Sequence, residues 1–371
     1  MTKIAINCAF YYPKAGGIKE YIYNLVWNLH KLNSEYEFVL YVPADYLAYA
    51  EENLPKEFRK ISLAFSSKNP IKRSLLEGMF WRQQERIEKF DLFHSPFFHA
   101  PKFKHAKIIL TVHDLRLEVF PNTYAKLRYY FLKYKVPRSI KRANHIISIS
   151  EFTKSEIIKF YSVPPNKITA ILEAVNRDFF NEKNISSTDR KVEGKFVFSV
   201  GHVETRKNYL RLIDAFERFC DKHSSTDLKL VIVGQLSHDF DEFLTRVKEN
   251  SRVIYLNFVD SNTLLWLYKN AEFFIMPSYY EGFGFPPLEA ASLETISAVS
   301  NTSSLPEVCG EAAFYFDPFD VFSIEQAFER LIFDEKYKES LLEKTKVNLE
   351  RFSWKKNAAD TIGVYAKLLD K

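Results

Sequence analysis

Short runs of β-branched and aromatic residues alternate with longer amphipathic segments through the first half of the chain. The runs have the composition of buried strands, and the longer segments repeat their apolar residues with a helical period. The predicted strands are Lys3–Phe10, Glu37–Val42, Lys107–Val112 and His145–Ile149, and the predicted helices are Ile18–Leu32, Ile71–Glu88 and Tyr124–Arg142. Strand–helix alternation of this kind predicts a parallel sheet covered by helices.

The second half of the chain repeats this alternation. Its predicted strands are Phe196–Val200, Leu228–Val233, Val253–Leu256 and Phe273–Met276, and its predicted helices are Tyr209–Cys220 and Phe240–Glu249. Between the halves, residues 176–194 are polar and charged, which is typical of a linker. We therefore predict two doubly wound α/β domains, over 1–175 and 195–353, that face each other across a cleft at the carboxyl ends of their strands.

Length and composition agree with two domains. The chain has 371 residues, of which 46% are hydrophobic and 27% charged, and this is typical of a globular protein too long for one core. No apolar run approaches the roughly 20 residues that cross a bilayer, and the N-terminus lacks the apolar core of a signal peptide. Cys8, Cys220 and Cys309 are far apart and fit buried thiols in a reducing compartment. We expect a cytoplasmic protein.

The net charge of +5 conceals an asymmetry between the two halves. Residues 1–175 hold 27 Lys and Arg against 16 Asp and Glu, a net charge of +11, whereas the remainder carries −6. Residues 124–142 combine cations with aromatic residues and hold no acid. Such a helix suits an anionic membrane surface near a lipid-linked acceptor, and a half-buried helix with solvated lysines has the same composition. Nothing else resembles a nucleic-acid-binding module.

The densest motif, Pro-Ser-Tyr-Tyr-Glu-Gly-Phe-Gly-Phe-Pro-Pro-Leu-Glu-Ala, spans residues 277–290 and follows a predicted strand. Gly282 and Gly284, on either side of Phe283, let the backbone approach a ligand closely, and the helix that follows offers its amides to an anion. One acidic residue of the motif is placed to meet a sugar and the other a ribose. These residues are Glu281 and Glu289. A glycine-containing loop with a surface glutamate at each end has the same pattern.

A second motif, Ser-Val-Gly-His-Val-Glu-Thr-Arg-Lys-Asn over residues 199–208, occupies the first strand-to-helix turn of the second half. Its adjacent Arg206 and Lys207 are suited to a diphosphate and to the charge that develops on a leaving phosphate. A helix start with two solvated cations is the alternative interpretation.

In the first half, a glycine pair and a histidine also follow predicted strands. Gly16 and Gly17 follow the first predicted strand, where a turn also accounts for them. His113 ends the strand Lys107–Val112 and is placed to reach a cleft, with Asp114 beside it to orient the ring. A histidine satisfied within the core fits the same position.

Together these motifs resemble the Glu-x7-Glu signature and its companions in the GT-B glycosyltransferases of family 4. The resemblance implies that Glu281 lies beside the donor sugar and that Glu289 binds the nucleotide ribose. It also implies that Arg206 and Lys207 grip the donor phosphates, helped by the amides of residues 282–284. In the first domain it implies that the loop of Gly16 and Gly17 closes over these phosphates and that His113 contacts the transferred sugar.

The resemblance extends over nearly the whole chain. The segments 301–308 and 352–354 match the later part of the family pattern, and a last helix over 354–371 is expected to rejoin the first domain. The similarity is greatest to the mannosyltransferase-like subgroup of bacterial polysaccharide and O-antigen synthesis. One departure lies at 292–296, Ser-Leu-Glu-Thr-Ile, where the family usually has a glycine-containing turn. The shape of this loop is therefore open.

The resemblance implies a retaining, metal-independent transferase without a cofactor. It would move a hexose, preferably mannose from GDP-mannose, to a glycan or a polyprenyl-diphosphate-linked acceptor on the inner face of the membrane. A UDP-sugar donor, a GT-B epimerase or phosphorylase, and a non-catalytic scaffold subunit of a polysaccharide assembly complex are the alternatives.

Other motifs point away from metal and nicotinamide chemistry. The Asp-Phe-Asp run at 239–241 has the spacing of a metal-binding Asp-x-Asp, but its place at a predicted helix start favours capping. The histidines fit no zinc spacing, and neither half opens with Gly-x-Gly-x-x-Gly.

Overall fold

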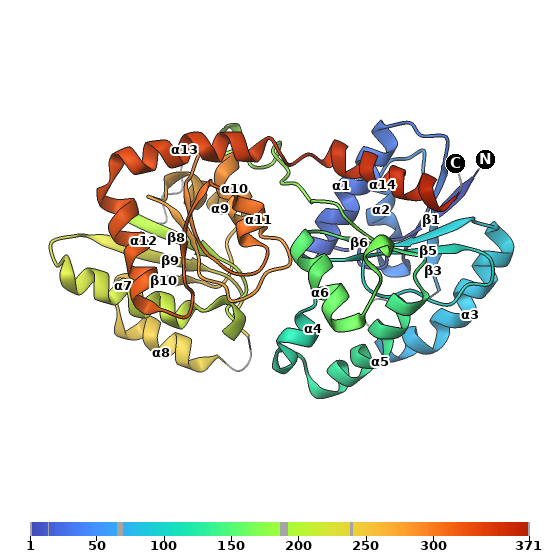
Figure 1. The fold of residues 1–371 in the computed structure, drawn as a ribbon, viewed down its shortest axis with the longest axis horizontal. Coiled ribbons are helices and arrows are strands. Elements are labelled where there is room, and N and C mark those ends of the chain that lie inside the picture. Colours follow the sequence, from blue (N-terminus) through green and yellow to red (C-terminus); the bar gives the residue numbers. More distant parts are fainter. Residues whose placement is uncertain (1, 14, 65–69, 186–191, 238–239, 370–371) are drawn as a thin grey trace. The chain divides into compact units, whose positions relative to one another are not determined.

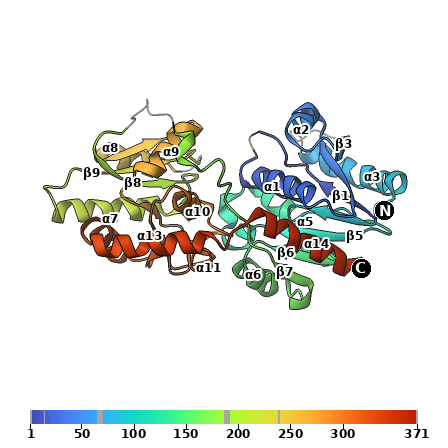
Figure 2. The same ribbon diagram turned by 90° about the horizontal axis from the view of Figure 1, so that it is seen from above.

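The computed structural model describes residues 2–13, 15–64, 70–185, 192–237 and 240–369. These residues form two compact units: unit 1 comprises residues 1–173 and 353–371, and unit 2 comprises residues 174–352. Each unit holds one fully parallel sheet (Figures 1 and 2). Among the described residues, no helix is both long and apolar enough to span a bilayer.

The sheet of unit 1 has seven parallel strands in the order β3-β2-β1-β4-β5-β6-β7. This order reverses direction at β1, as in a doubly wound dinucleotide-binding domain. The strands are β1 (Lys3–Asn7), β2 (Glu37–Pro43), β3 (Arg59–Leu63), β4 (Leu92–Ser95), β5 (Lys107–Val112), β6 (His145–Ser148) and β7 (Ile168–Ala170). The helices are α1 (Gly17–Lys31), α2 (Leu47–Asn53), α3 (Pro70–Glu88), α4 (Arg116–Val119), α5 (Lys126–Arg142), α6 (Glu151–Tyr161) and α14 (Trp354–Leu368).

Helices cover both faces of this sheet. Trp81 of α3, Ile140 of α5 and Ile157 of α6 pack in one apolar cluster with side chains of the central strands, and Figure 1 shows α1, α2 and α14 on the opposite face. The C-terminal helix α14 is joined to the sheet through a buried polar chain. The hydroxyl of Tyr365 lies 2.6 Å from Nδ1 of His94, whose Nε2 is 2.8 Å from Oγ1 of Thr111. Because burial lowers the pKa of His94 to about 3, this histidine stays neutral and structural.

The sheet of unit 2 has six parallel strands in the order β10-β9-β8-β11-β12-β13. The strands are β8 (Lys195–Val200), β9 (Leu228–Val233), β10 (Val253–Leu256), β11 (Phe274–Met276), β12 (Ser297–Ser300) and β13 (Ala313–Phe316). The helices are α7 (Tyr209–Lys222), α8 (Asp241–Glu249), α9 (Ser261–Asn270), α10 (Phe285–Ser292), α11 (Leu305–Cys309), α12 (Val321–Phe333) and α13 (Glu335–Leu349).

Alternate side chains of β8 enter the two faces of this second sheet. Val197 joins the apolar cluster formed with α7, α8 and α12, while the neighbouring Phe198 contacts Tyr268 of α9 with ring centroids 4.9 Å apart. Successive strand residues point to opposite faces, so a central strand needs apolar residues at every position. The polar residues of unit 2 that matter chemically are therefore placed beyond the strand ends.

Candidate active site

The carboxyl end of β8 leads into a short 3-10 helix, η5 (Thr205–Lys207), which places two cations side by side. Gly201 has φ +149°, and a Cβ there would lie 2.9 Å from Cε of Lys207. A side chain at this position would therefore displace the lysine. Asn208 follows η5 with φ +59°, and its Nδ2 donates to the carbonyls of Pro277 and Pro318 at 3.0 and 2.8 Å. These bonds fix η5 against the loops after β11 and β13.

Arg206, Lys207 and Glu281 form one buried charge cluster. Nζ of Lys207 lies 2.7 Å, and Nη1 of Arg206 lies 2.9 Å, from Oε1 of Glu281. Arg206 also donates to the Glu204 carboxylate through Nε (3.0 Å) and Nη2 (2.8 Å) and to the carbonyl of Tyr280 at 2.6 Å. The side chains of Arg206, Lys207 and Glu281 are 11%, 9% and 12% exposed. The fold thus joins two motifs that are separated by about seventy residues.

Burial and charge oppose each other within this cluster. Burial alone raises the pKa of Glu281, but the charges of Arg206 and Lys207 outweigh it and lower that pKa to about 2. Burial and the neighbouring Arg206 lower the pKa of Lys207, although Glu281 acts in the opposite direction. Because a buried ammonium has lost its hydration, contact with a further anion stabilises the charged form of Lys207.

The glycine-containing loop after β11 is held by two serines at the start of α11. Oγ of Ser303 accepts from the backbone N–H of Glu281 at 3.1 Å, and Oγ of Ser304 donates to the carbonyls of Glu281 and Phe283 at 3.0 and 2.6 Å. Gly284 has φ +119°, and a Cβ there would lie 2.8 Å from Cδ2 of Leu305. The sequence motif predicts this loop, but the two serines that hold it lie about twenty residues further along the chain and carry no local signal.

Phe283 and Gly282 are buried in this loop. The ring of Phe283 packs against the rings of Phe285 and Phe352 at centroid distances of 5.2 and 5.9 Å. A contact of Phe283 with a donor would therefore come from its main chain, and its side chain serves the core.

Glu289 lies on α10 and is half-buried. Its Oε2 accepts from the hydroxyl of Tyr268 on α9 at 2.5 Å. Tyr268 is buried, and burial together with the Glu289 charge raises its pKa well above the usual value, so the phenol remains a donor. Tyr268 therefore holds one oxygen of the Glu289 carboxylate in place, a contact that the sequence motif did not reveal.

The loop at 292–296 makes its turn without the glycine. Glu294 takes the left-handed conformation with φ +59°, and the N–H of Thr295 donates to the carbonyl of Ala290 at 2.9 Å to end α10. A non-glycine residue in this region costs roughly 1–2 kcal/mol. The Glu294 carboxylate lies 2.8 Å from Nζ of Lys346. The departure from the family pattern thus leaves the turn, and the helix that carries Glu289, in place.

In unit 1, Gly16 and Gly17 form the start of α1. Gly16 has φ +61°, and a Cβ at either position would meet nothing within 4 Å, so only the backbone of Gly16 requires glycine. Tyr21, one turn into α1, contacts the ring of His113 edge-on at 4.9 Å. The helix that these glycines begin therefore contacts His113 through Tyr21.

His113 is oriented by Glu173, and the prediction that Asp114 orients it was wrong. Nε2 of His113 lies 2.9 Å from the carbonyl oxygen of Pro96, and Nδ1 lies 3.0 Å from Oε1 of Glu173. Asp114 instead accepts from the N–H of Arg116 at 3.0 Å. Glu173 is 1% exposed, so its ion pair with His113 is shielded from water. Sixty residues separate this pair in sequence, and no local pattern marks it.

Replacing Glu173 by Gln is expected to lower the pKa of His113. Burial lowers this pKa from 6.5, but the negative charge of Glu173 outweighs burial and raises it. The pair therefore stabilises unit 1 below about pH 6.5, and this stabilisation is lost as the pH rises through the raised pKa. An NMR titration of the His113 C2 proton measures this pKa in wild type and in Glu173→Gln. An unchanged pKa in Glu173→Gln would contradict the pairing.

The Asp-Phe-Asp run is predicted to cap a helix, but the N-cap residue of α8 is Phe240, which makes no side-chain capping bond. Asp239 lies outside the described residues, and Asp241 is the first residue of α8. Acidic residues are favoured in a first turn because they complement the helix dipole. Among the described residues, no group of three His, Cys, Asp or Glu is placed to hold a metal ion.

Two doubly wound sheets in one chain, the second bearing a cation pair and a Glu-x7-Glu helix start, define the GT-B class of glycosyltransferases. The structure is similar to that of sucrose-phosphate synthase from Thermosynechococcus elongatus, with a TM-score of 0.77 over 100% of both chains and 16% identity. At this identity the likeness concerns the fold.

Two family models together cover most of the sequence. "Glycosyltransferase Family 4" matches residues 15–179, and "Glycosyl transferases group 1" matches residues 180–348. The chain belongs to the family 4 glycosyltransferases, and it is a sugar-transferring enzyme.

Two curated relatives carry mannosyltransferase names. O-antigen chain mannosyltransferase B of Escherichia coli is 28% identical over 96% of this chain and 97% of its own length. Serotype-specific mannosyltransferase WbdA of Escherichia coli is 29% identical over 62% of this chain, and the match spans 29% of that longer protein.

Proposed function

We propose that this enzyme transfers mannose from GDP-mannose, with retention and without a metal, to a growing glycan or a polyprenyl-diphosphate-linked acceptor. The observation that carries the proposal is the buried Arg206–Lys207–Glu281 cluster at the carboxyl end of β8. A nucleotide diphosphate is a suitable ligand for such cations. The name of the Escherichia coli relative, an O-antigen chain mannosyltransferase, supports mannose and O-antigen polysaccharide assembly.

Within the cluster, Lys207 is the cation better suited to the donor. Arg206 also donates to the Glu204 carboxylate and the Tyr280 carbonyl, whereas the ammonium of Lys207 donates to Glu281 alone among the described residues. We assign Lys207 to the diphosphate, Glu281 to the sugar and Glu289 to the ribose. Gly282, Phe283 and Gly284 contribute main chain around the phosphates, and unit 1 contributes Gly16, Gly17 and His113.

The proposed reaction breaks the bond between the sugar C1 and the diphosphate oxygen and forms the new bond on the same face. The acceptor hydroxyl oxygen attacks C1, and its proton passes to an oxygen of the departing diphosphate. Lys207 stabilises the charge that develops on this leaving group, which is the task that a bound metal performs in other transferases. Since both ring nitrogens of His113 face Pro96 and Glu173, its ring does not act as the base.

A thermal-shift panel with GDP, UDP, ADP and CMP, each with and without EDTA, tests this proposal. A ligand at about 100 times its dissociation constant stabilises a folded protein by roughly 2.7 kcal/mol. We expect GDP to raise the melting temperature equally with and without EDTA. A shift with UDP alone would replace GDP-mannose by a UDP-sugar donor. If no nucleotide binds, a scaffold subunit becomes the better description.

We further propose that unit 1 contacts the inner face of the cytoplasmic membrane through residues 124–142. Four apolar or aromatic side chains of α5 share one helix face and are well exposed. They are Leu127 (88%), Tyr130 (69%), Phe131 (39%) and Tyr134 (56%). The opposite face buries Val136, Ser139 and Ile140. An exposed aromatic stripe flanked by cations is typical of a helix that lies in a membrane interface.

Replacing Leu127 by Ser is expected to weaken binding to phosphatidylglycerol-containing vesicles by about tenfold, because an exposed leucine gains roughly 1.5–3 kcal/mol when it enters an apolar phase. Sedimentation with vesicles measures the change. The matched control is Phe258→Ser in unit 2, where the side chain is 85% exposed. Equal binding of the two variants would exclude α5 as the contact.

A further inference from the structure

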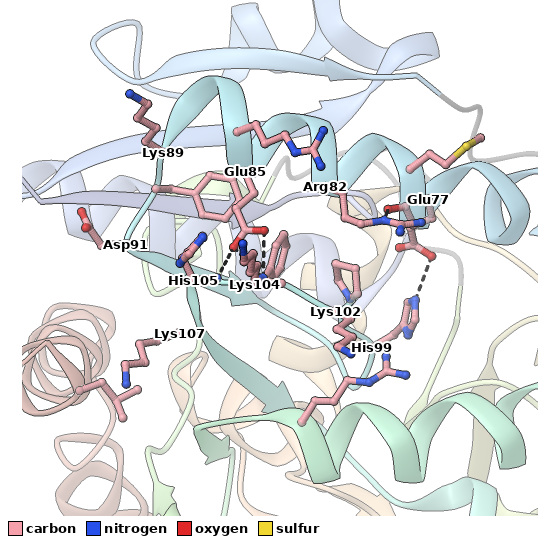
Figure 3. Close-up of a pocket in the computed structure, with 18 of the residues that line it drawn as sticks. Glu77, Arg82, Glu85, Lys89, Asp91, His99, Lys102, Lys104, His105 and Lys107 are labelled. Atoms are coloured by element: carbon pink, nitrogen blue, oxygen red, sulfur yellow. Dashed lines mark hydrogen bonds and ion pairs between the residues drawn. The ribbon is translucent and has the colours of Figure 1, made fainter.

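A second concave site lies in unit 1 and plays no part in the proposed transfer. It is a cavity of about 1280 Å³ between α3, α5 and the segments that precede β4 and β5 (Figure 3). Asp91 directly precedes β4, and Lys107 is the first residue of β5. Parallel strands begin at one edge of a sheet, so the cavity is at the amino edge, opposite Gly16, Gly17 and His113.

Cations dominate this cavity. Eight lysines and arginines line it against three carboxylates. Lys89, Lys102 and Lys104 are exposed and come from the segments before the two strands, and the exposed Lys107 begins β5. The helices α3 and α5 supply the other four. None of the eight is within ion-pair distance of a carboxylate among the described residues. Cations collected in a concave surface reinforce one another's field.

The three carboxylates in the cavity are engaged by other groups. Glu85 accepts the backbone N–H groups of Lys104, His105 and Ala106 at 2.7–3.0 Å. Figure 3 shows Glu85 beside Lys104 and His105. Oε2 of Glu77 lies 2.9 Å from Nε2 of His99, and Oδ2 of Asp91 accepts from the N–H of Lys3 at 2.8 Å. The acids therefore build the cavity wall, and Glu85 in particular fixes the loop that carries Lys102 and Lys104.

We propose that this cavity binds a ligand bearing two or more phosphate groups. Phosphate oxygens are the anions that several converging lysines and arginines hold best, and no buried acid needs to be displaced. Two sources supply such a group at the size of this cavity, a free oligophosphate and the headgroup of an anionic lipid. The site is independent of the donor site proposed for unit 2.

Calorimetry with inorganic tripolyphosphate and sedimentation with cardiolipin-containing vesicles test the two sources on the full chain. The test variant is Lys102→Ala/Lys104→Ala, and the matched control is Lys56→Ala/Lys167→Ala, whose lysines are exposed in unit 1 outside the cavity. We expect the test variant to bind the preferred probe at least about tenfold more weakly than wild type and control, with a loss that shrinks at high salt.

GDP binding by the same variants separates this site from the donor site, because a loss confined to tripolyphosphate or vesicles leaves unit 2 intact. Binding of tripolyphosphate identifies a free oligophosphate as the ligand class, and binding of vesicles alone identifies a lipid headgroup. If wild type binds neither probe, or if both double variants bind equally, the proposal is overturned.

Discussion

Replacing Lys207 by Ala is expected to lower the turnover number of sugar transfer by about a hundred- to a thousandfold. A single preorganised group that meets developing charge in a buried site is worth this much. Nζ of Lys207 lies 2.7 Å from Glu281 and is held over the end of β8 by the space that Gly201 leaves. Because we propose that the lysine stabilises the leaving phosphate in the transition state, its loss is expected to affect turnover more than substrate affinity.

The fold of the Lys207→Ala variant is expected to survive, because Glu281 keeps its ion pair with Arg206 at 2.9 Å. Transfer from GDP-mannose, followed by product formation, measures the effect. Lys344→Ala is the matched control, since Lys344 is an exposed lysine paired with Glu311 at 3.3 Å. Wild-type turnover in Lys207→Ala would refute the role assigned to this residue.

Replacing Glu281 by Gln is expected to destabilise unit 2 by about 3 kcal/mol in the absence of donor. The change removes the carboxylate charge that faces both buried cations, and breaking a buried ion pair typically costs this much. Trp266 is the single tryptophan of unit 2, so the ¹⁹F signal of fluorotryptophan-labelled protein during urea unfolding reports this unit alone. Glu343→Gln, at an exposed position of α13, is the control and should change stability by less than about 0.5 kcal/mol.

The same variant carries a pH signature. Glu281 has a pKa lowered from 4.5 to about 2, so its charge stabilises the folded state above pH 4.5 and the contribution is lost as the pH falls towards 2. The stability difference between wild type and Glu281→Gln should therefore shrink over this range. A constant difference would mean that the carboxylate acts through packing alone. GDP should also bind more tightly to the variant, because the competing carboxylate charge is gone.

The sequence pattern predicted well the strands whose β-branched and other apolar residues form a clear run. The strands β5, β9 and β10 begin and end where the apolar runs predicted, and β11 begins one residue later than predicted. The short strands β3, β4, β7, β12 and β13 were not predicted. β12 reads Ser-Ala-Val-Ser, which has neither a clear alternation nor a long apolar run, and its pairing with β11 and β13 defines it. Long-range pairing of this kind leaves no local signal.

In the candidate site, too, the sequence marks some residues and leaves their partners unmarked. Arg206, Lys207, Glu281 and Glu289 stand out in the sequence because their spacing and flanking glycines are local. Their partners do not, since Tyr268 meets Glu289 from another helix and Glu173 meets His113 across sixty residues. Asp114 was the natural guess for His113 because it is adjacent, but the chain turns it towards the N–H of Arg116. Side-chain partners brought together by tertiary packing are set by topology, which a single sequence does not record.

Calorimetric titration of GDP-mannose into wild type and Lys207→Ala, both in EDTA, tests the central claim most directly. We expect wild type to bind GDP-mannose without a metal. We expect Lys207→Ala to bind it at least about tenfold more weakly, which corresponds to one lost charge-assisted contact of about 1.4 kcal/mol. Equal affinity of the two proteins, or binding by wild type only after a divalent metal is restored, would contradict it.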